Sequence, residues 1–158
     1  MTGFRRGVRL GIDVGKARIG VARSDPDGML ATPVETVPRA SGDPIARIIA
    51  LAGEHGAVEL VVGLPLNLRG EETLSTIDAK EFAGALAAAS DTPVRMVDER
   101  LSTVSANSAL RDAGRSQRSS RSIVDQVAAV VLLQHAIDTE KSTGRSPGLP
   151  VPPSQEPA

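Results

Sequence analysis

The segment from residue 58 to residue 64 constrains the fold more than any other part of this chain. Its sequence, VELVVGL, is a nearly continuous run of β-branched and other apolar residues. It follows a stretch from Pro44 to about Gly56 in which apolar residues recur at helical spacing. A strand of this kind is typical of the centre of a parallel sheet, where helices cover both faces. We therefore expect an α/β protein with residues 58–64 as a buried central strand.

Turn signals and periodicity predict the other elements. Residues 8–13 and 18–23 alternate with a period of two around the turn at 14–17, which predicts a β-hairpin. A third antiparallel strand up to Val37, a fifth strand at residues 94–97, and helices at about 77–90, 102–113 and from Ser122 onward are also expected. The fold class is thus α/β with a five-stranded mixed sheet, three antiparallel strands and then two parallel ones, flanked by helices.

This connectivity predicts which strands meet. The strand at 58–64 is expected to pair with the strand at 8–13. Right-handed crossovers then place the ends of the first, fourth and fifth strands near each other. The residues that follow these strands are therefore the first place to look for chemistry.

The chain of 158 residues is expected to be one domain with a tail. Residues 1–141 are interpreted as the domain. Residues 142–158 contain five prolines and no periodicity, which predicts a disordered C-terminal tail. The longest apolar run, residues 127–133, is far shorter than a membrane span of about 18 residues, so the expected location is the cytoplasm.

Composition excludes several kinds of site. The chain has no Cys and only two His, so disulfides, thiol catalysis and Cys- or His-rich metal sites are not expected. A net charge of −1 conceals two basic zones, residues 1–23 and 111–121, around an acidic middle. Arg dominates the basic residues, which suits bidentate phosphate contacts or reflects a GC-rich genome. Any bound metal would be held mainly by carboxylates.

Three acidic positions are candidates for such a site. Asp13 ends the first strand before a glycine turn, Glu99 follows the fifth strand together with Asp98, and Asp125 lies near the start of the last helix. Each also has a structural interpretation: Asp13 as a turn former, and Glu99 and Asp125 as acids that favour a helix start. Taken together, three acids without His or Cys suit Mg²⁺ or Mn²⁺, and such ions support phosphodiester hydrolysis.

Several segments resemble a known family. They are residues 9–16 with 19–22, residues 62–67, residues 98–103 and, after these, residues 125–129. In this order they look like the signature blocks of the YqgF-type, RuvX-like family of pre-16S rRNA nucleases, also called Holliday junction resolvase-like proteins. The resemblance covers roughly residues 8–138.

The resemblance implies an RNase H-like fold, a cytoplasmic bacterial protein and metal-dependent cleavage of nucleic acid. It assigns Asp13, Glu99 and Asp125 as the catalytic, metal-binding acids, and we add Asp98 as a backup ligand. The expected substrate contacts are Lys16, Arg18, Asn67 and Arg100, which fall in the family blocks, and Arg115, Arg118 and Arg121, which form a basic segment read as a loop.

The leading hypothesis is a Mg²⁺- or Mn²⁺-dependent endonuclease that processes the 5′ end of pre-16S rRNA, with the ribosome as a further partner and no membrane contact. One alternative is a Holliday junction resolvase acting on branched DNA. A non-catalytic RNA- or ribosome-binding factor and an actin-like, phosphate-binding ATPase domain are the others. The sequence leaves a monomer or a homodimer open.

Overall fold

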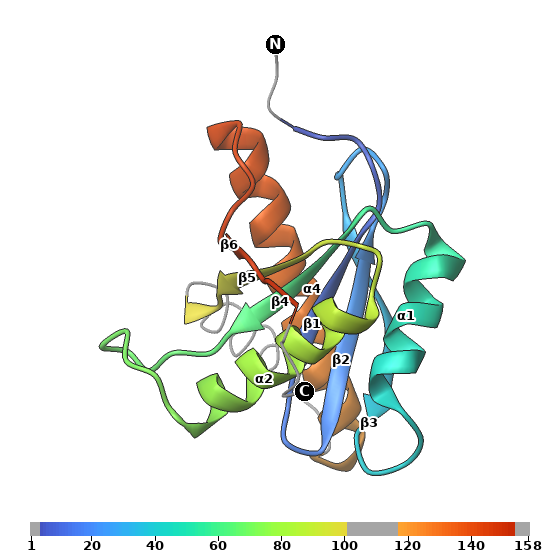
Figure 1. Cartoon of the computed structure of the whole chain (residues 1–158), viewed down its shortest axis with the longest axis vertical. Coiled ribbons are helices and arrows are strands. Elements are labelled where there is room, and N and C mark those ends of the chain that lie inside the picture. Colours follow the sequence, from blue (N-terminus) through green and yellow to red (C-terminus); the bar gives the residue numbers. More distant parts are fainter. Residues whose placement is uncertain (1–3, 101–116, 154–158) are drawn as a thin grey trace.

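Six strands form one sheet in the order β3-β2-β1-β4-β5-β6 (Figure 1). The structure is a computed structural model that describes residues 4–100 and 117–153; for residues 117–125 it describes only the helical backbone. The strands are β1 Arg9–Val14, β2 Arg18–Ser24, β3 Ala31–Pro38, β4 Glu59–Leu64, β5 Val94–Asp98 and β6 Leu149–Pro150. The helices are α1 Pro44–His55, α2 Leu74–Ala89 and α4 Gln117–Thr143. The helix expected at 102–113 lies outside the described residues.

The pairing confirms the predicted mixed sheet. β1 and β2 form an antiparallel hairpin in which Asp13 lies opposite Gly20, and β3 extends it. β4 is parallel to β1, with Ile12 opposite Val62, and β5 is parallel to β4. The carboxyl ends of β1, β4 and β5 therefore meet at one edge of the sheet, as the right-handed crossovers predict.

Helices cover the two faces of the sheet unequally (Figure 1). On one face, Leu10 and Ile12 of β1 pack in a core shared with α1 and α2. On the other face, α4 is the one helix of the described residues, and it packs against Ala22 of β2, Ala31 of β3, Val61 of β4 and Val97 of β5. Helix α4 can approach β1 closely because Gly11 has no side chain; a Cβ atom there would overlap Leu133 and the Ala129 carbonyl. In the described parts of the chain, no helix is long and apolar enough to cross a membrane.

Helix α4 begins earlier than the sequence indicates. The capping signal at Ser122 predicts a start there, whereas the helix includes residues 117–121. The basic segment expected to be a loop is therefore helical from Gln117, with Arg115 outside the described residues. The sequence QRSSR has neither Gly nor Pro to stop a helix, so a long helix can extend through it.

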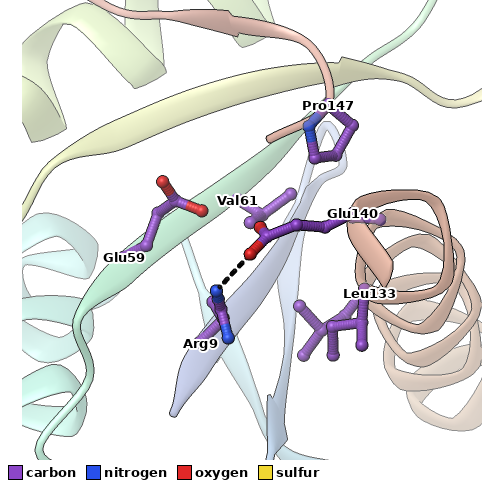
Figure 2. A pocket seen from close by; sticks show the side chains of 8 residues that line it. Arg9, Glu59, Val61, Leu133, Glu140 and Pro147 are labelled. Carbon is purple, nitrogen blue, oxygen red and sulfur yellow. Dashed lines mark hydrogen bonds and ion pairs between the residues drawn. The ribbon is translucent and has the colours of Figure 1, made fainter. Parts of the chain in front are cut away.

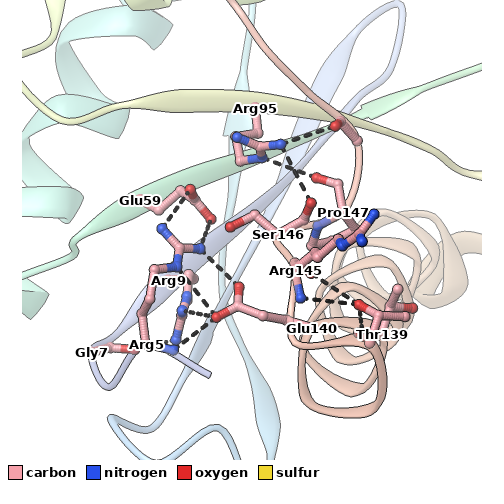
Figure 3. Close-up of polar contacts among 12 residues, drawn as sticks. Arg5, Gly7, Arg9, Glu59, Arg95, Thr139, Glu140, Arg145, Ser146 and Pro147 are labelled. Carbon is pink, nitrogen blue, oxygen red and sulfur yellow. Dashed lines mark hydrogen bonds and ion pairs between the residues drawn. The ribbon is translucent and has the colours of Figure 1, made fainter. Parts of the chain in front are cut away.

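The chain after Ser142 also differs from the expected disordered tail. Helix α4 continues to Thr143, and β6 then pairs antiparallel with β5 and adds a sixth strand to the predicted five. Figure 3 shows Arg95 reaching this segment, where its Nε donates to the Pro147 carbonyl at 3.0 Å and its Nη2 to the Gly148 carbonyl at 2.9 Å. An edge strand tolerates proline, so a proline-rich sequence can pair here. Residues 154–158 lie outside the described residues.

Four charged side chains gather under the amino ends of β1 and β4; we call Arg5, Arg9, Glu59 and Glu140 the amino-end ion cluster (Figures 2 and 3). Arg9 is 2% exposed, and its Nη2 donates to Glu140 Oε2 at 2.9 Å. The Nη2 of Arg5 donates to Glu140 Oε1 at 2.8 Å and to Glu59 Oε1 at 3.1 Å. Two cations and two carboxylates thus balance one another; Arg9, Glu59 and Glu140 are buried, whereas the Arg5 side chain is 47% exposed.

Candidate active site

Two of the predicted acids meet at the carboxyl edge of the sheet. Asp13 lies near the end of β1, and Glu99 directly follows β5. The Glu99 amide donates to the Leu64 carbonyl at 3.2 Å, which continues the parallel pairing of β4 and β5 and fixes the position of Glu99. A side-chain hydrogen bond joins Glu99 to Asp13. The two acids therefore lie close together, as the predicted meeting of the strand ends implies.

Gly63 makes room for the Glu99 carboxylate. A Cβ atom at Gly63 would overlap Glu99 Oε2 and crowd Leu132 of α4. Continuing the register that pairs Ile12 with Val62 places Gly63 beside Asp13. Gly63 is not among the site residues predicted from the sequence. Its signal was available, because a glycine inside a β-branched strand often marks a close approach by another group.

The electrostatics of this pair are unfavourable for two negative charges. Burial, the charge of Asp13, its hydrogen bond and the charge of Asp98 raise the pKa of Glu99 to about 8. This raised pKa favours the protonated form of the Glu99 carboxyl near neutral pH. A strongly raised carboxyl pKa at a strand edge is typical of a functional site.

Asp98 does not join the pair, which corrects the expectation that it serves as a backup ligand. Because side chains alternate along a strand, Asp98 shares the face of Met96, whereas Glu99 shares the α4 face with Val97. The Arg100 Nη2 lies 2.5 Å from Asp98 Oδ2, and this hydrogen bond lowers the pKa of Asp98. Arg100, a predicted substrate contact, is thus engaged by Asp98.

The third predicted acid, Asp125, lies in α4, where the structure describes the backbone but not its side chain. One turn further along, Ala129 packs against Gly11 of β1. The adjacent Gln126 Nε2 donates to Thr36 Oγ1 at 2.9 Å, and Thr36 is paired with Gly20 opposite Asp13. Among the described residues, no group of three His, Cys, Asp or Glu side chains is placed to hold a metal ion.

The remaining predicted contacts divide into three groups. Lys16 is exposed in the β1–β2 turn, and Arg18 begins β2 beside it. Asn67 shapes its own loop: its Oδ1 accepts from the Arg69 and Glu71 amides, each at 2.9 Å. Arg118 and Arg121 belong to α4, but their side chains, like all of Arg115, lie outside the described residues.

The mixed sheet with helices on both faces and the acidic pair at its carboxyl edge are typical of one class of protein. This class is the nucleases of RNase H-like fold, which hydrolyse phosphodiester bonds. Residues 7–139 match the family RuvX, which is described as "Holliday junction resolvase". The chain belongs to this family of nucleases, as its sequence blocks predicted.

Relatives and a solved structure agree with this assignment. A protein of Clavibacter michiganensis named "Putative pre-16S rRNA nuclease" is 59% identical over 151 residues, which cover 94% of each chain. A protein of the same name from Streptomyces avermitilis is 48% identical and covers 92% of this chain and 95% of its own. The fold is similar to that of T. thermophilus RuvC in complex with a Holliday junction substrate, with a TM-score of 0.50, 17% identity, and coverage of 91% of this chain and 99% of the RuvC chain. This confirms the RNase H-like fold.

Proposed function

We propose that this protein is a divalent-metal-dependent endonuclease that processes the 5′ end of pre-16S rRNA in the cytoplasm. The observation that carries the proposal is the hydrogen-bonded Asp13–Glu99 pair at the carboxyl edge of the sheet. The names of the relatives, which describe pre-16S rRNA nucleases, favour the rRNA substrate over others. The ribosome, or a precursor of it, is the expected partner.

The residues at this edge fit a hard divalent cation. Two partly buried carboxylates this close together repel each other, which contributes to the raised pKa of Glu99, and a dication can offset that repulsion. Asp13 and Glu99 would hold the ion. Asp125 is proposed as the third acid, because the helical backbone places its Cα one turn from the Ala129–Gly11 contact. Mg²⁺ or Mn²⁺, when bound, would neutralise phosphate charge and lower the pKa of a water.

The residues of the chain perform the remaining tasks in this proposal. Gly63 keeps the Glu99 carboxylate against the strand end, so the acidic pair is positioned before substrate arrives. Lys16 and Arg18 at the hairpin would contact the nucleic-acid backbone, whereas Arg100 would first have to leave Asp98. With only two Phe and no Tyr or Trp, the chain relies on charge and shape more than on base stacking.

Cleavage by the wild-type protein and by Asp13→Asn tests this proposal. We expect Mg²⁺- or Mn²⁺-dependent cutting of a pre-16S rRNA fragment that EDTA abolishes and that Asp13→Asn lowers by at least about 100-fold. The reason is that outer-shell partners of metal sites already cost 10- to 100-fold, and a ligand costs more. Melting temperature should change little, since removal of one crowded charge offsets any local loss.

The family description makes branched DNA the second candidate substrate. A four-way junction is therefore assayed beside the RNA fragment and a matched linear duplex. Faster cutting of the junction would replace the rRNA role by junction resolution. Binding of the RNA without metal, and no cutting of either substrate by folded wild-type protein, would instead indicate a non-catalytic binding factor.

A further inference from the structure

A second polar pocket lies beside the acidic pair, on the opposite face of the same sheet edge. It has a volume of about 470 Å³ and opens between the β1–β2 turn and the first turns of α2. Gly15 and Lys16 contribute from the turn, Ser75 and Asp78 from α2, and Arg39 from the end of β3. Arg39, Ser75 and Asp78 are not among the predicted site residues and do not belong to the proposed catalytic site.

Arg39 is held in a fixed orientation in this pocket. Its Nη1 donates to Asp78 Oδ2 at 2.6 Å and to the Gly15 carbonyl at 2.9 Å, and its Nη2 donates to Asp78 Oδ1 at 3.0 Å. The guanidinium also lies over the Phe82 ring, 5.6 Å from its centre. A guanidinium has five N–H donors, and these contacts use three of them. The other two have no hydrogen-bond acceptor among the described residues.

The hairpin adds further positive charge to this pocket. Lys16 is exposed and makes no ion pair within residues 4–100 and 117–153. The Arg39 amide donates to the Ala17 carbonyl at 3.0 Å, which joins the end of β3 to the turn that carries Lys16. Two cations, Lys16 and Arg39, therefore line the pocket together with one described carboxylate, Asp78. This excess of charge favours an anionic ligand.

The pocket is close to the proposed site of cleavage. Lys16 is three residues beyond Asp13, so at most about 10 Å of extended chain separates them. Both the acidic pair and the pocket lie at the carboxyl edge, where ligands of α/β sheets bind. A strand with one phosphate at the acidic pair would thus bring a neighbouring phosphate to the pocket.

We propose that Lys16 and Arg39 bind a backbone phosphate of the substrate a short distance from the scissile one, with Ser75 as an additional donor and Asp78 as the residue that orients Arg39. This inference rests on the proposed function, because it takes the acidic pair as the point of cleavage. The phosphate contact would set the register of the strand across the sheet edge. It carries no base information, as expected for backbone contacts.

Binding of a fluorescein-labelled pre-16S rRNA fragment in EDTA, followed by anisotropy at several salt concentrations, tests the pocket without cleavage. Lys16→Ala should weaken binding about five- to eightfold at 0.1 M salt and reduce the salt slope by about 0.7–0.9, the effect of one lost phosphate contact. Lys16→Arg should retain binding. The matched control is Lys141→Ala, which removes the same charge at the end of α4, where Lys141 lies over Phe4; it should bind like the wild type.

Asp78→Asn should change the affinity for RNA in the opposite direction from Lys16→Ala. It removes the carboxylate charge that offsets Arg39 and should tighten binding about two- to fivefold, as expected for a partly exposed ion pair. A purely structural Arg39–Asp78 pair predicts unchanged or weaker binding. Unchanged affinity of Lys16→Ala, or unchanged or weaker affinity of Asp78→Asn, would therefore overturn the proposal.

Two further experiments complete the test. One distinguishes a backbone phosphate from a free phosphate compound, and the other distinguishes failure of the pocket proposal from failure of the proposed function. ATP or inorganic phosphate that competes with the RNA at micromolar concentration would assign the pocket to a free phosphate compound and overturn the backbone assignment. If Asp13→Asn abolishes cutting but Lys16→Ala binds normally, only the pocket proposal fails. If Lys16→Ala weakens binding but wild-type protein never cuts, the proposed catalytic function fails and the phosphate site stands.

Discussion

The two ends of the α4-covered face of the sheet treat buried charge in opposite ways. At the amino ends of β1 and β4, the amino-end ion cluster pairs two arginines with two glutamates, and its hydrogen bonds lie between 2.8 and 3.3 Å. At the carboxyl ends, less than one strand length away, Asp13 and Glu99 bring two carboxylates together and raise the pKa of Glu99 to about 8. The same strands, β1, β4 and β5, and the same helix, α4, support both ends.

The difference teaches which charges serve stability and which serve function. In the amino-end ion cluster each carboxylate has a guanidinium beside it, and the hydrogen bonds from Arg5 hold the pKa of Glu140 below its usual value against the effect of burial. At the carboxyl edge the folded chain keeps two like charges close, which costs free energy unless a proton or a cation is added. Such crowding indicates a site prepared for a ligand.

The largest expected effect on stability comes from removing a carboxylate of the amino-end ion cluster. Glu140→Ala leaves Arg9 buried without its carboxylate, so the free energy of unfolding should fall by about 3–5 kcal/mol. Thermal denaturation measures this loss. Glu35→Ala is the matched control, because Glu35 pairs with Arg47 at the surface, and such a pair contributes at most about 1 kcal/mol. Equal losses in the two variants would remove the contrast between this cluster and a surface pair.

Gly63→Ala should have an intermediate effect at the acidic end. The added methyl group would displace the Glu99 carboxylate and press on Leu132, at a cost of about 1–3 kcal/mol in the free energy of unfolding. Cleavage by the remaining folded protein should also fall, since Glu99 is no longer held beside Asp13. Gly53→Ala in α1, where an added Cβ meets nothing, is the control and should be neutral or slightly stabilising. Full activity of Gly63→Ala would separate Glu99 from the site.

Glu99→Gln in EDTA is expected to change stability in the opposite direction and to increase it. The pKa of Glu99 in the folded protein, about 8, lies above the ordinary glutamate value of 4.5, so the folded protein holds a proton that the unfolded chain releases. The stability of the wild type must therefore fall as the pH rises from about 4.5 to 8, whereas the glutamine variant lacks this loss. At pH 8 the variant should be more stable by at least about 1 kcal/mol, or roughly 2–4 °C in melting temperature.

Comparison of the melting temperatures at pH 4.5 is the internal control, since the two proteins should differ little there. Added Mg²⁺ should reduce the advantage of Glu99→Gln at pH 8 by stabilising the wild type. A variant that is less stable than the wild type at pH 8 would show that the Glu99 charge is already compensated in the folded protein.

Much of the fold could be predicted because the signals are local. The glycine turn after β1, the β-branched run of β4 and the Asp43–Pro44 start of α1 each specify their element over a few residues. The short strand β6 could not be predicted in this way. Its pairing depends on Arg95, about 50 residues earlier, whose side chain donates to the Pro147 and Gly148 carbonyls.

For the candidate site, too, some features follow from the local sequence and others only from the tertiary structure. That Asp13 and Glu99 end strands is a property of the sequence alone, and so is the family to which the signature blocks point. Only the tertiary structure decided that Glu99 faces α4 while Asp98 faces away, that Gly63 gives the carboxylate its space, and that Arg39 and Asp78 border a pocket beside the site. The physical reason is that periodicity and turn chemistry act between near neighbours, whereas the charge that a carboxylate experiences depends on groups brought together from distant parts of the chain.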